Sequence, residues 1–159
     1  MLFLDLPKGL KEMVRVTKPG GAELIISFSM PERVDFIHFF FTALQSVAPD
    51  FQGLPRDPLP LPFQVSDPTV LRHRMEAAGL QDVQVTRETE HFEYQSGTGL
   101  WNSVLSSNPI ATQVTAGLTE KQKRQAQQLL DERVEARAGR DGVAVLQAEL
   151  NVGVGRKEG

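Results

Sequence analysis

Histidine and serine side chains are the candidates for acid–base or nucleophilic chemistry in this sequence, which contains no cysteine. The three histidines, His38, His73 and His91, lack the H-x-x-x-H spacing that places two zinc ligands on one face of a helix. Ser27 and Ser29 end an apolar segment, but no histidine–acid pair is evident that would make either serine a nucleophile. We therefore expect both serines to position or cap neighbouring groups. The absence of cysteine also excludes thiolate zinc sites.

Aromatic side chains form a second group of candidates. The segment 34–47 is rich in phenylalanine and apolar around most of a helical circumference. Such a helix is typical of a packed core, and the alternative is that some of its rings, Phe41 among them, line a ligand pocket. Phe51, Trp101 and Tyr94 are the rings that would complete such a pocket, with ordinary core packing as the alternative for each.

Length, composition and charge predict one globular domain, 1–159. The chain has 159 residues, of which 40% are hydrophobic and 23% charged. Its formal net charge of −3 disfavours nucleic-acid binding, because phosphate contacts need clustered cations. No apolar run reaches the roughly 20 residues of a membrane span, and no leader precedes a small-residue cleavage site. We therefore expect a cytoplasmic protein without a membrane partner.

The elements that must position these side chains alternate between helix and strand, which predicts an α/β fold. Consecutive apolar residues at 24–26 suit a strand covered on both faces, and alternation in the last strand predicts one buried apolar face. That face comprises Ala144, Leu146, Ala148, Leu150, Val152 and Val154. Helices are predicted over 8–18, 34–47, 68–78, 100–106 and 119–137, and strands over 22–29, 81–94 and 143–154.

The stretch 48–66 contains five prolines and precludes a regular helix or a central strand. A connection of this length is unusual inside a compact domain, and it is more often a lid or a binding loop than filler. A stiff surface linker is the alternative.

The segment Leu10-Lys-Glu-Met-Val-Arg-Val-Thr-Lys-Pro-Gly-Gly21 resembles the "L-x-E-x-x-R-V-L-K-P-G-G" motif of class I S-adenosylmethionine-dependent methyltransferases. Within that family, the chain is most similar to small-molecule methyltransferases of the ubiquinone/menaquinone-biosynthesis type. In the family, the motif is the helix and turn before the fifth strand, which 22–29 matches. The resemblance then continues through Ala78-Gly79-Leu80 to a last strand ending at Leu150-Asn-Val-Gly-Val-Gly-Arg156. It implies a partial Rossmann-like sheet of strands five to seven, with the last strand antiparallel and helices flanking the sheet.

The sequence departs from the family at the cofactor site. The family binds its cofactor with a D-x-G-x-G-x-G turn in its N-terminal half, and this chain has no such unit. We interpret Gly97-x-Gly99 and Gly153-x-Gly155 as plain turns and not as cofactor loops. Residues Met1–Pro7 resemble the family stretch just after strand four, which predicts that the chain is the C-terminal half of a methyltransferase. S-adenosylmethionine is then the cofactor of the intact enzyme, and we expect this chain alone to bind it weakly or not at all.

The resemblance also suggests roles for individual residues. The segment carrying His38 borders the acceptor substrate in relatives, so His38 is a candidate general base, with a structural histidine as the alternative. Ser29, Phe41, Phe51 and Trp101 are candidates for binding the substrate, which would be a small and apolar organic acceptor. No metal site is predicted.

The resemblance leaves two other functions open. Without strand four, strand five presents an unpaired hydrophobic edge, which would pair with a second copy or with a separately encoded N-terminal half. The chain would then be a non-catalytic interaction module. A small-ligand carrier that uses the phenylalanine-rich helix and the proline-rich loop as a pocket is a further alternative.

Overall fold

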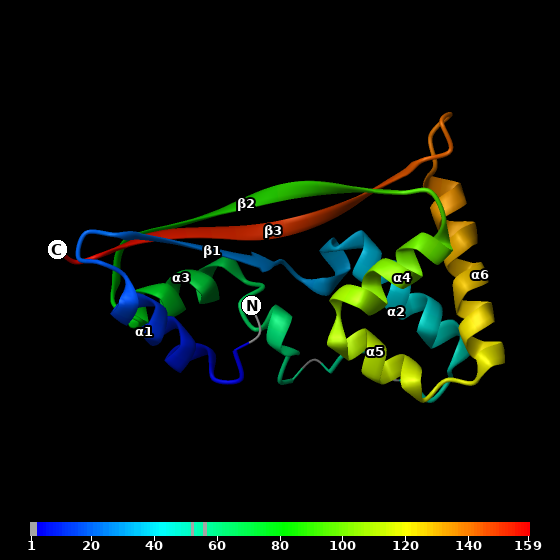
Figure 1. The fold of residues 1–159 in the computed structure, drawn as a ribbon, viewed down its shortest axis with the longest axis horizontal. Helices are drawn as coiled ribbons and strands as arrows, with labels where there is room; N and C mark the ends of the chain where they lie inside the picture. The colour runs from blue at the N-terminus through cyan, green and yellow to red at the C-terminus, as the bar shows by residue number, and fades with distance from the viewer. Residues whose placement is uncertain (1–2, 52, 56) are drawn as a thin grey trace. The chain divides into compact units, whose positions relative to one another are not determined.

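The computed structural model describes residues 3–51, 53–55 and 57–159. The chain divides into two compact units, which we describe separately. Unit 1 comprises residues 1–30, 56–90 and 149–159, and unit 2 comprises residues 31–55 and 91–148. The ribbon in Figure 1 gives the labels of the helices and strands. Within the described residues, no helix combines the length and the apolar character needed to cross a membrane.

The described strands form a three-stranded sheet with the order β1-β3-β2. Its strands are β1 (Ala22–Phe28), β2 (Leu80–Tyr94) and β3 (Ala144–Lys157), so the last strand lies in the middle. β1 and β3 pair antiparallel, with Leu24 opposite Val154. β3 also runs antiparallel to β2, because Leu80 lies beside Gly155 whereas Arg87 lies beside Glu149. The predicted α/β class and the antiparallel last strand are confirmed.

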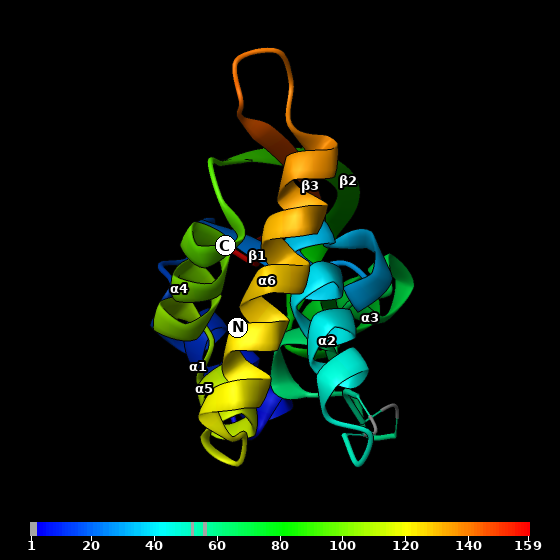
Figure 2. The ribbon, with the colours of Figure 1, turned by 90° about the vertical axis from the view of Figure 1, so that its right-hand side faces the viewer.

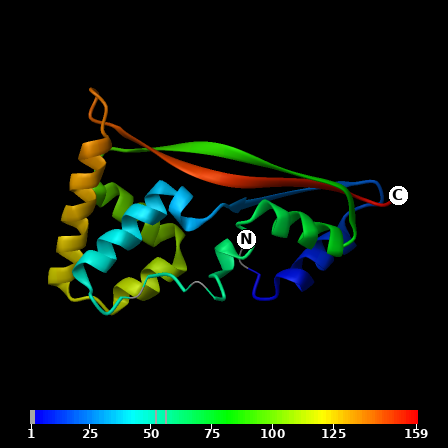
Figure 3. The same ribbon diagram turned by 180° about the vertical axis from the view of Figure 1, so that it is seen from behind.

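Two helices cover one face of this sheet in unit 1. They are α1 (Leu6–Val16) and α3 (Pro68–Ala77), which lie side by side in Figure 3. Their buried side chains form one core with Ile25 of β1. A β-carbon on Gly153 would lie only 2.5 Å from Met75 Sδ, so α3 packs directly over β3. Members of this core are Leu6, Leu10, Val14, Ile25, Val65, Leu71, Met75, Leu80 and Val83.

Two predictions about the strands are wrong in unit 1. β1 is covered on one face only, because Leu24 and Ile26 on the other face are 60% and 50% exposed. In β3 the buried residues change from Ala144, Leu146 and Ala148 to Asn151, Gly153 and Gly155. Helix α3 approaches β3 so closely that glycine fits beneath it at Gly153, while Gly155 lies against Leu80 and Val83 of β2. The valines that alternate with these glycines face outward.

Helices dominate unit 2. They are η1 (Pro31–Arg33), α2 (Asp35–Val47), α4 (Gly97–Ser107), α5 (Pro109–Ala116) and α6 (Glu120–Arg137). Figure 2 shows α2 and α6 side by side, and the Arg133 guanidinium of α6 joins them by donating to the Phe39 carbonyl at 2.8 Å. Burial lowers the pKa of Arg133, and the nearby negative charge of Glu132 partly offsets this effect.

Capping residues explain most helix boundaries. Thr119 and Gln122 form a capping box at the start of α6, which agrees with the helix predicted from residue 119. Helix α1 begins two residues before the predicted start at residue 8. Asp5 caps this helix, and Pro7 occupies its first turn. Helix α5 was not among the predicted helices. Asn108 both ends α4 and caps α5, where its side chain accepts from the backbone N–H of Ile110 at 3.0 Å.

The proline-rich stretch 48–66 is irregular apart from η2 (Leu61–Phe63), as expected. Two of its residues, Gln52 and Arg56, lie outside the described part of the chain. Met1 and Leu2, which belong to the segment predicted to follow strand four, also lie outside it. The roles of lid or linker and the assignment of one domain stay predictions.

Replacing Asp67 with alanine is expected to destabilise the protein by about 1 kcal/mol at neutral pH, since Asp67 caps α3. Hydrogen bonds from the Thr69 side chain and backbone lower the pKa of Asp67 below its ordinary value of 3.8. The cap therefore stabilises fully above the unfolded pKa, and its contribution is lost as pH falls through the lowered native pKa. Urea unfolding at several pH values checks this, and a difference between the two proteins that does not shrink in acid would contradict it.

Candidate functional site

Buried polar groups gather at the carboxyl end of β1 in unit 1. Ser27 Oγ donates to the Val65 carbonyl at 3.2 Å, and Ser29 Oγ donates to Glu149 Oε1 at 2.7 Å. Asn151 Nδ2 donates to the carbonyls of Val65 at 3.2 Å and Ser66 at 2.7 Å. These bonds fasten the end of the proline-rich stretch to the sheet. Ser27 and Ser29 therefore position neighbouring groups in this structure, as their sequence context indicated.

Asn151 is the residue of this cluster that sequence analysis missed. It is fully buried, and its Oδ1 has no hydrogen-bond partner among the described residues. A buried acceptor of this kind can receive one further donor, from water or from a ligand hydroxyl. Asn151 follows Gln147 and Glu149 on the polar side of the last strand, so the sequence pattern gave no signal of its burial.

Ser29 is almost inaccessible as a substrate contact in this conformation. It is 1% exposed, and its hydroxyl proton is already given to Glu149. Glu149 in turn lies 3.7 Å from the Arg87 guanidinium on the neighbouring strand. An acceptor molecule would therefore meet Ser29 only after the hydroxyl changes partner.

Unit 2 brings three of the aromatic candidates, Phe41, Phe51 and Trp101, into one cluster. The Trp101 ring of α4 lies 5.1 Å from the Phe40 ring of α2, and Phe40 lies 5.4 Å from Phe41. Phe51 stacks on Phe41 with 5.9 Å between ring centroids and 25° between planes. Trp101 and Phe41 are buried, whereas Phe51 is half-buried. The cluster thus presents Phe51 as its accessible ring, and a flat apolar molecule could stack there.

His38 lies on the exposed side of α2. Its ring centroid is 6.4 Å from that of Phe39, whereas the aromatic cluster involves the buried residues Phe40 and Phe41. The exposed His91 Nε2 lies 3.5 Å from the side-chain nitrogen of Gln147. The Tyr94 hydroxyl lies 3.5 Å from the Ser103 hydroxyl. Within the described ranges, no three histidine or acidic side chains form a group that could hold a metal ion.

The two glycine pairs do not fit an adenosyl cofactor cradle. At the start of α4, Ser96 Oγ already accepts from the Gly99 N–H at 3.0 Å, and Asp131 accepts from the Thr98 N–H at 3.1 Å. These donors are therefore not free for a ligand. Gly153 and Gly155 face the side chains of Met75, Leu80 and Val83 and serve packing.

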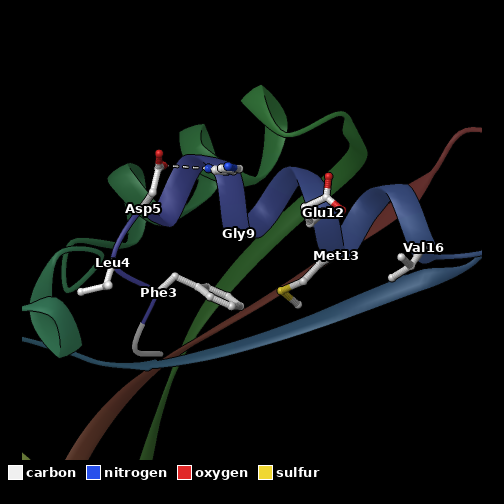
Figure 4. Close-up of a pocket in the computed structure, with 8 residues that line it drawn as sticks. Phe3, Leu4, Asp5, Gly9, Glu12, Met13 and Val16 are labelled. Atoms are coloured by element: carbon white, nitrogen blue, oxygen red, sulfur yellow. Dashed lines mark hydrogen bonds between the residues drawn. The ribbon is translucent and has the colours of Figure 1, made fainter.

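A pocket of about 480 Å³ lies along α1 in unit 1, where sequence analysis predicted none. Figure 4 shows Phe3, Met13 and Val16 pointing from this part of the chain toward β1. The Phe3 ring packs on the helix backbone at Gly9, where a β-carbon would meet the ring at 2.5 Å. The pocket is also lined by Leu4, Asp5, Lys8 and Glu12.

Comparison with known proteins finds one curated methyltransferase. Over 51 residues, 32% of this chain, the sequence is 45% identical to a ubiquinone/menaquinone biosynthesis C-methyltransferase from Geotalea daltonii. A putative methyltransferase from Bacillus halodurans superposes with a TM-score of 0.45 and 15% identity, covering 99% of this chain. No family model matches the sequence.

The matched regions cover 22% of the curated relative and 60% of the solved structure. The partial coverage of the curated relative fits the prediction of a similarity confined to part of a methyltransferase. The curated match thereby confirms that the chain resembles class I S-adenosylmethionine-dependent methyltransferases, as the motif between Leu10 and Gly21 indicated.

Proposed function

We propose that this chain is the acceptor-side part of an S-adenosylmethionine-dependent methyltransferase. The intact enzyme would transfer a methyl group to a small, apolar organic molecule in the cytoplasm. The observation that carries this proposal is the 45% identity over 51 residues to a C-methyltransferase of quinone biosynthesis. The site that binds the methyl donor would lie outside these residues.

The aromatic cluster of unit 2 is the proposed acceptor surface. Phe51 would stack on a planar acceptor, with Phe41 behind it and Trp101 fixing the position of α2 through Phe40. S-adenosylmethionine supplies the methyl group when it is bound in the intact enzyme. The contribution of these residues would be to hold and orient the acceptor and to exclude water, since methyl transfer depends largely on alignment.

A soluble naphthoquinol is expected to quench the fluorescence of Trp101, the only tryptophan, in a saturable manner. Replacing Phe51 with alanine should weaken this binding about tenfold, because a stacked ring is lost. The matched control is Phe92→Ala, which removes another partly exposed ring of unit 2 that packs on Phe36. Quenching that does not saturate, or that is unchanged in Phe51→Ala, would contradict the proposed surface.

His38 is the proposed general base on the exposed side of α2. If it accepts a proton from the acceptor, adding the naphthoquinol should perturb the NMR resonances of the His38 ring and leave those of the His73 ring unchanged. Equal effects on both rings, or no effect on either, would assign His38 a structural role. His38→Ala identifies the resonance without removing a buried side chain.

A further inference from the structure

Met30 is the most exposed methionine of the described residues. It directly follows Ser29 at the carboxyl end of β1 and is 41% exposed. Met75 is fully buried in the core of unit 1, and Met13 packs half-buried against the same core. A thioether that solvent reaches is open to oxidation by peroxides, whereas a buried one is protected. The fold of unit 1 therefore distinguishes Met30 from the other two methionines.

A hydrogen bond defines the surroundings of the Met30 sulfur. The Ser66 hydroxyl donates to Met30 Sδ, with 3.1 Å between oxygen and sulfur. Ser66 is buried, and its backbone carbonyl accepts from Asn151 Nδ2 at 2.7 Å. The backbone N–H of Ser66 donates to the Phe63 carbonyl at 3.1 Å. Two backbone hydrogen bonds thus hold the residue whose hydroxyl contacts the sulfur.

The contact lies where the proline-rich stretch is fastened to the sheet. Ser66 belongs to the segment 61–66, which the side chains of Ser27 and Asn151 also hold. A thioether sulfur is a weak acceptor compared with the carbonyl oxygens that accept those other bonds. Met30 is therefore the readily oxidised side chain among the described groups that fasten this segment.

The two lone pairs of the Met30 sulfur are not equivalent. A thioether sulfur carries two lone pairs, and oxidation at one or the other gives the two epimers of methionine sulfoxide. In Met30 one lone pair accepts the hydroxyl proton of the buried Ser66. The second lone pair cannot face the same donor, so an oxidant arriving from solvent meets it first.

We propose that Met30 is a site of reversible oxidation by hydrogen peroxide or an organic hydroperoxide, and that Ser66 directs the oxidant to one face of the sulfur. The free lone pair attacks a peroxide oxygen, an S–O bond forms and the O–O bond breaks. The departing oxygen takes up a proton and leaves as water or as an alcohol. The sulfur loses two electrons, which reduce the peroxide. Methionine sulfoxide reductases, which draw electrons from thiols, return the product to the thioether.

Peroxide treatment of the folded 159-residue chain tests whether Met30 is the preferred site. Trypsin then releases Met13, Met30 and Met75 on separate peptides, because lysine or arginine residues separate them in the sequence. Mass spectrometry of these peptides gives the rate of oxidation at each methionine. Met30 should be oxidised about tenfold faster than Met75, because only Met30 is exposed.

The epimer composition of the Met30 sulfoxide tests the role of Ser66. The peptide that ends at Arg33 is treated separately with each of the two epimer-specific reductases. One reductase should repair about five times as much sulfoxide as the other, since attack on the occupied lone pair requires loss of the hydrogen bond. The chain unfolded in guanidinium chloride is the reference, and it should give nearly equal epimers and similar rates at Met30 and Met75.

Ser66→Ala removes the directing hydroxyl and keeps the backbone carbonyl that Asn151 contacts. The two epimers should then form in nearly equal amounts, while Met30 stays reactive. Thr86→Ala is the matched control, because it removes an exposed hydroxyl elsewhere in unit 1 and should leave the bias unchanged. The comparison of folded with unfolded wild-type chain needs no variant, so it decides the matter even where Ser66→Ala fails to fold.

The proposal is wrong if Met30 and Met75 are oxidised equally fast in the folded chain. It is also overturned by equal epimers from the folded wild type, or by a bias that survives in Ser66→Ala. None of these measurements involves methyl transfer, so they stand or fall separately from the proposed function.

Discussion

Replacing Gly97 with alanine is expected to destabilise unit 2 by about 3 kcal/mol or more. A β-carbon at Gly97 would lie 2.1 Å from the Asp131 backbone nitrogen and 2.3 Å from the Leu130 carbonyl carbon. These atoms belong to the backbone of α6, so relief requires the two helices to separate. Such overpacking typically costs about 1–3 kcal/mol, and rigid backbone leaves little room for adjustment.

Gly99→Ala provides the matched control in the same helix. Its β-carbon would approach only Ser96 Oγ, at 3.3 Å, so the free energy of unfolding should change by less than about 1 kcal/mol. Urea unfolding followed by Trp101 fluorescence measures both variants in unit 2. Equal stability of Gly97→Ala and Gly99→Ala would contradict the close contact between α4 and α6.

Replacing Asn151 with alanine is expected to cost about 2–4 kcal/mol. The side chain donates to two buried carbonyls, and the Ser66 carbonyl would be left without this donor, while that of Val65 keeps the Ser27 hydroxyl. An unsatisfied buried group costs about 1–3 kcal/mol, and the lost side-chain volume adds a cavity. Circular dichroism during urea unfolding gives the change in free energy.

Gln147→Ala is the control for Asn151→Ala, because Gln147 lies on the same strand and is exposed. Its effect should stay within about 0.5 kcal/mol. Hydrogen exchange should also show faster opening of residues 61–66 in Asn151→Ala, since the hydrogen bonds that fasten this segment are removed. A loss below about 1 kcal/mol would mean that water replaces the amide in this site.

Local chemistry made many elements of the fold predictable from sequence. Asp67-Pro68 and the T-x-x-Q spacing at Thr119 define helix starts through their own side chains, and the structure has both caps. Helix α5 was not predicted, because a single residue, Asn108, both ends α4 and starts α5. Residues that end helices, such as asparagine followed by proline, look the same in sequence whether a turn or a new helix follows.

Tertiary packing determines which strand residues are buried and where glycine is required, and the sequence patterns did not predict either. Three consecutive apolar residues at 24–26 indicated burial on both faces, but the described chain covers only the face of Ile25. Burial in β3 changes phase after Ala148 because helix α3 packs on Gly153, and Leu80 and Val83 of β2 pack on Gly155. Gly97 gave no sequence signal, since its requirement comes from a helix far along the chain.

The candidate site was partly predictable for the same reason. Phe41, Phe51 and Trp101 were selected as aromatic residues, and the structure brings them into one cluster through Phe40. Ser29 belongs to unit 1 and bonds to Glu149, a partner 120 positions away that periodicity does not reveal. The pocket beside α1 depends on the Phe3 ring folding back onto Gly9, which also has no signature in the sequence.

In the proposed function, residues of this chain contact the acceptor, and residues outside this chain contact the methyl donor. Isothermal titration of the 159-residue chain with S-adenosylmethionine tests that division most directly. We expect no saturable heat at millimolar concentrations of the donor, because the glycine turns at 97–99 and 153–155 have packing roles and offer no free cradle. One-to-one binding with micromolar affinity would contradict the account.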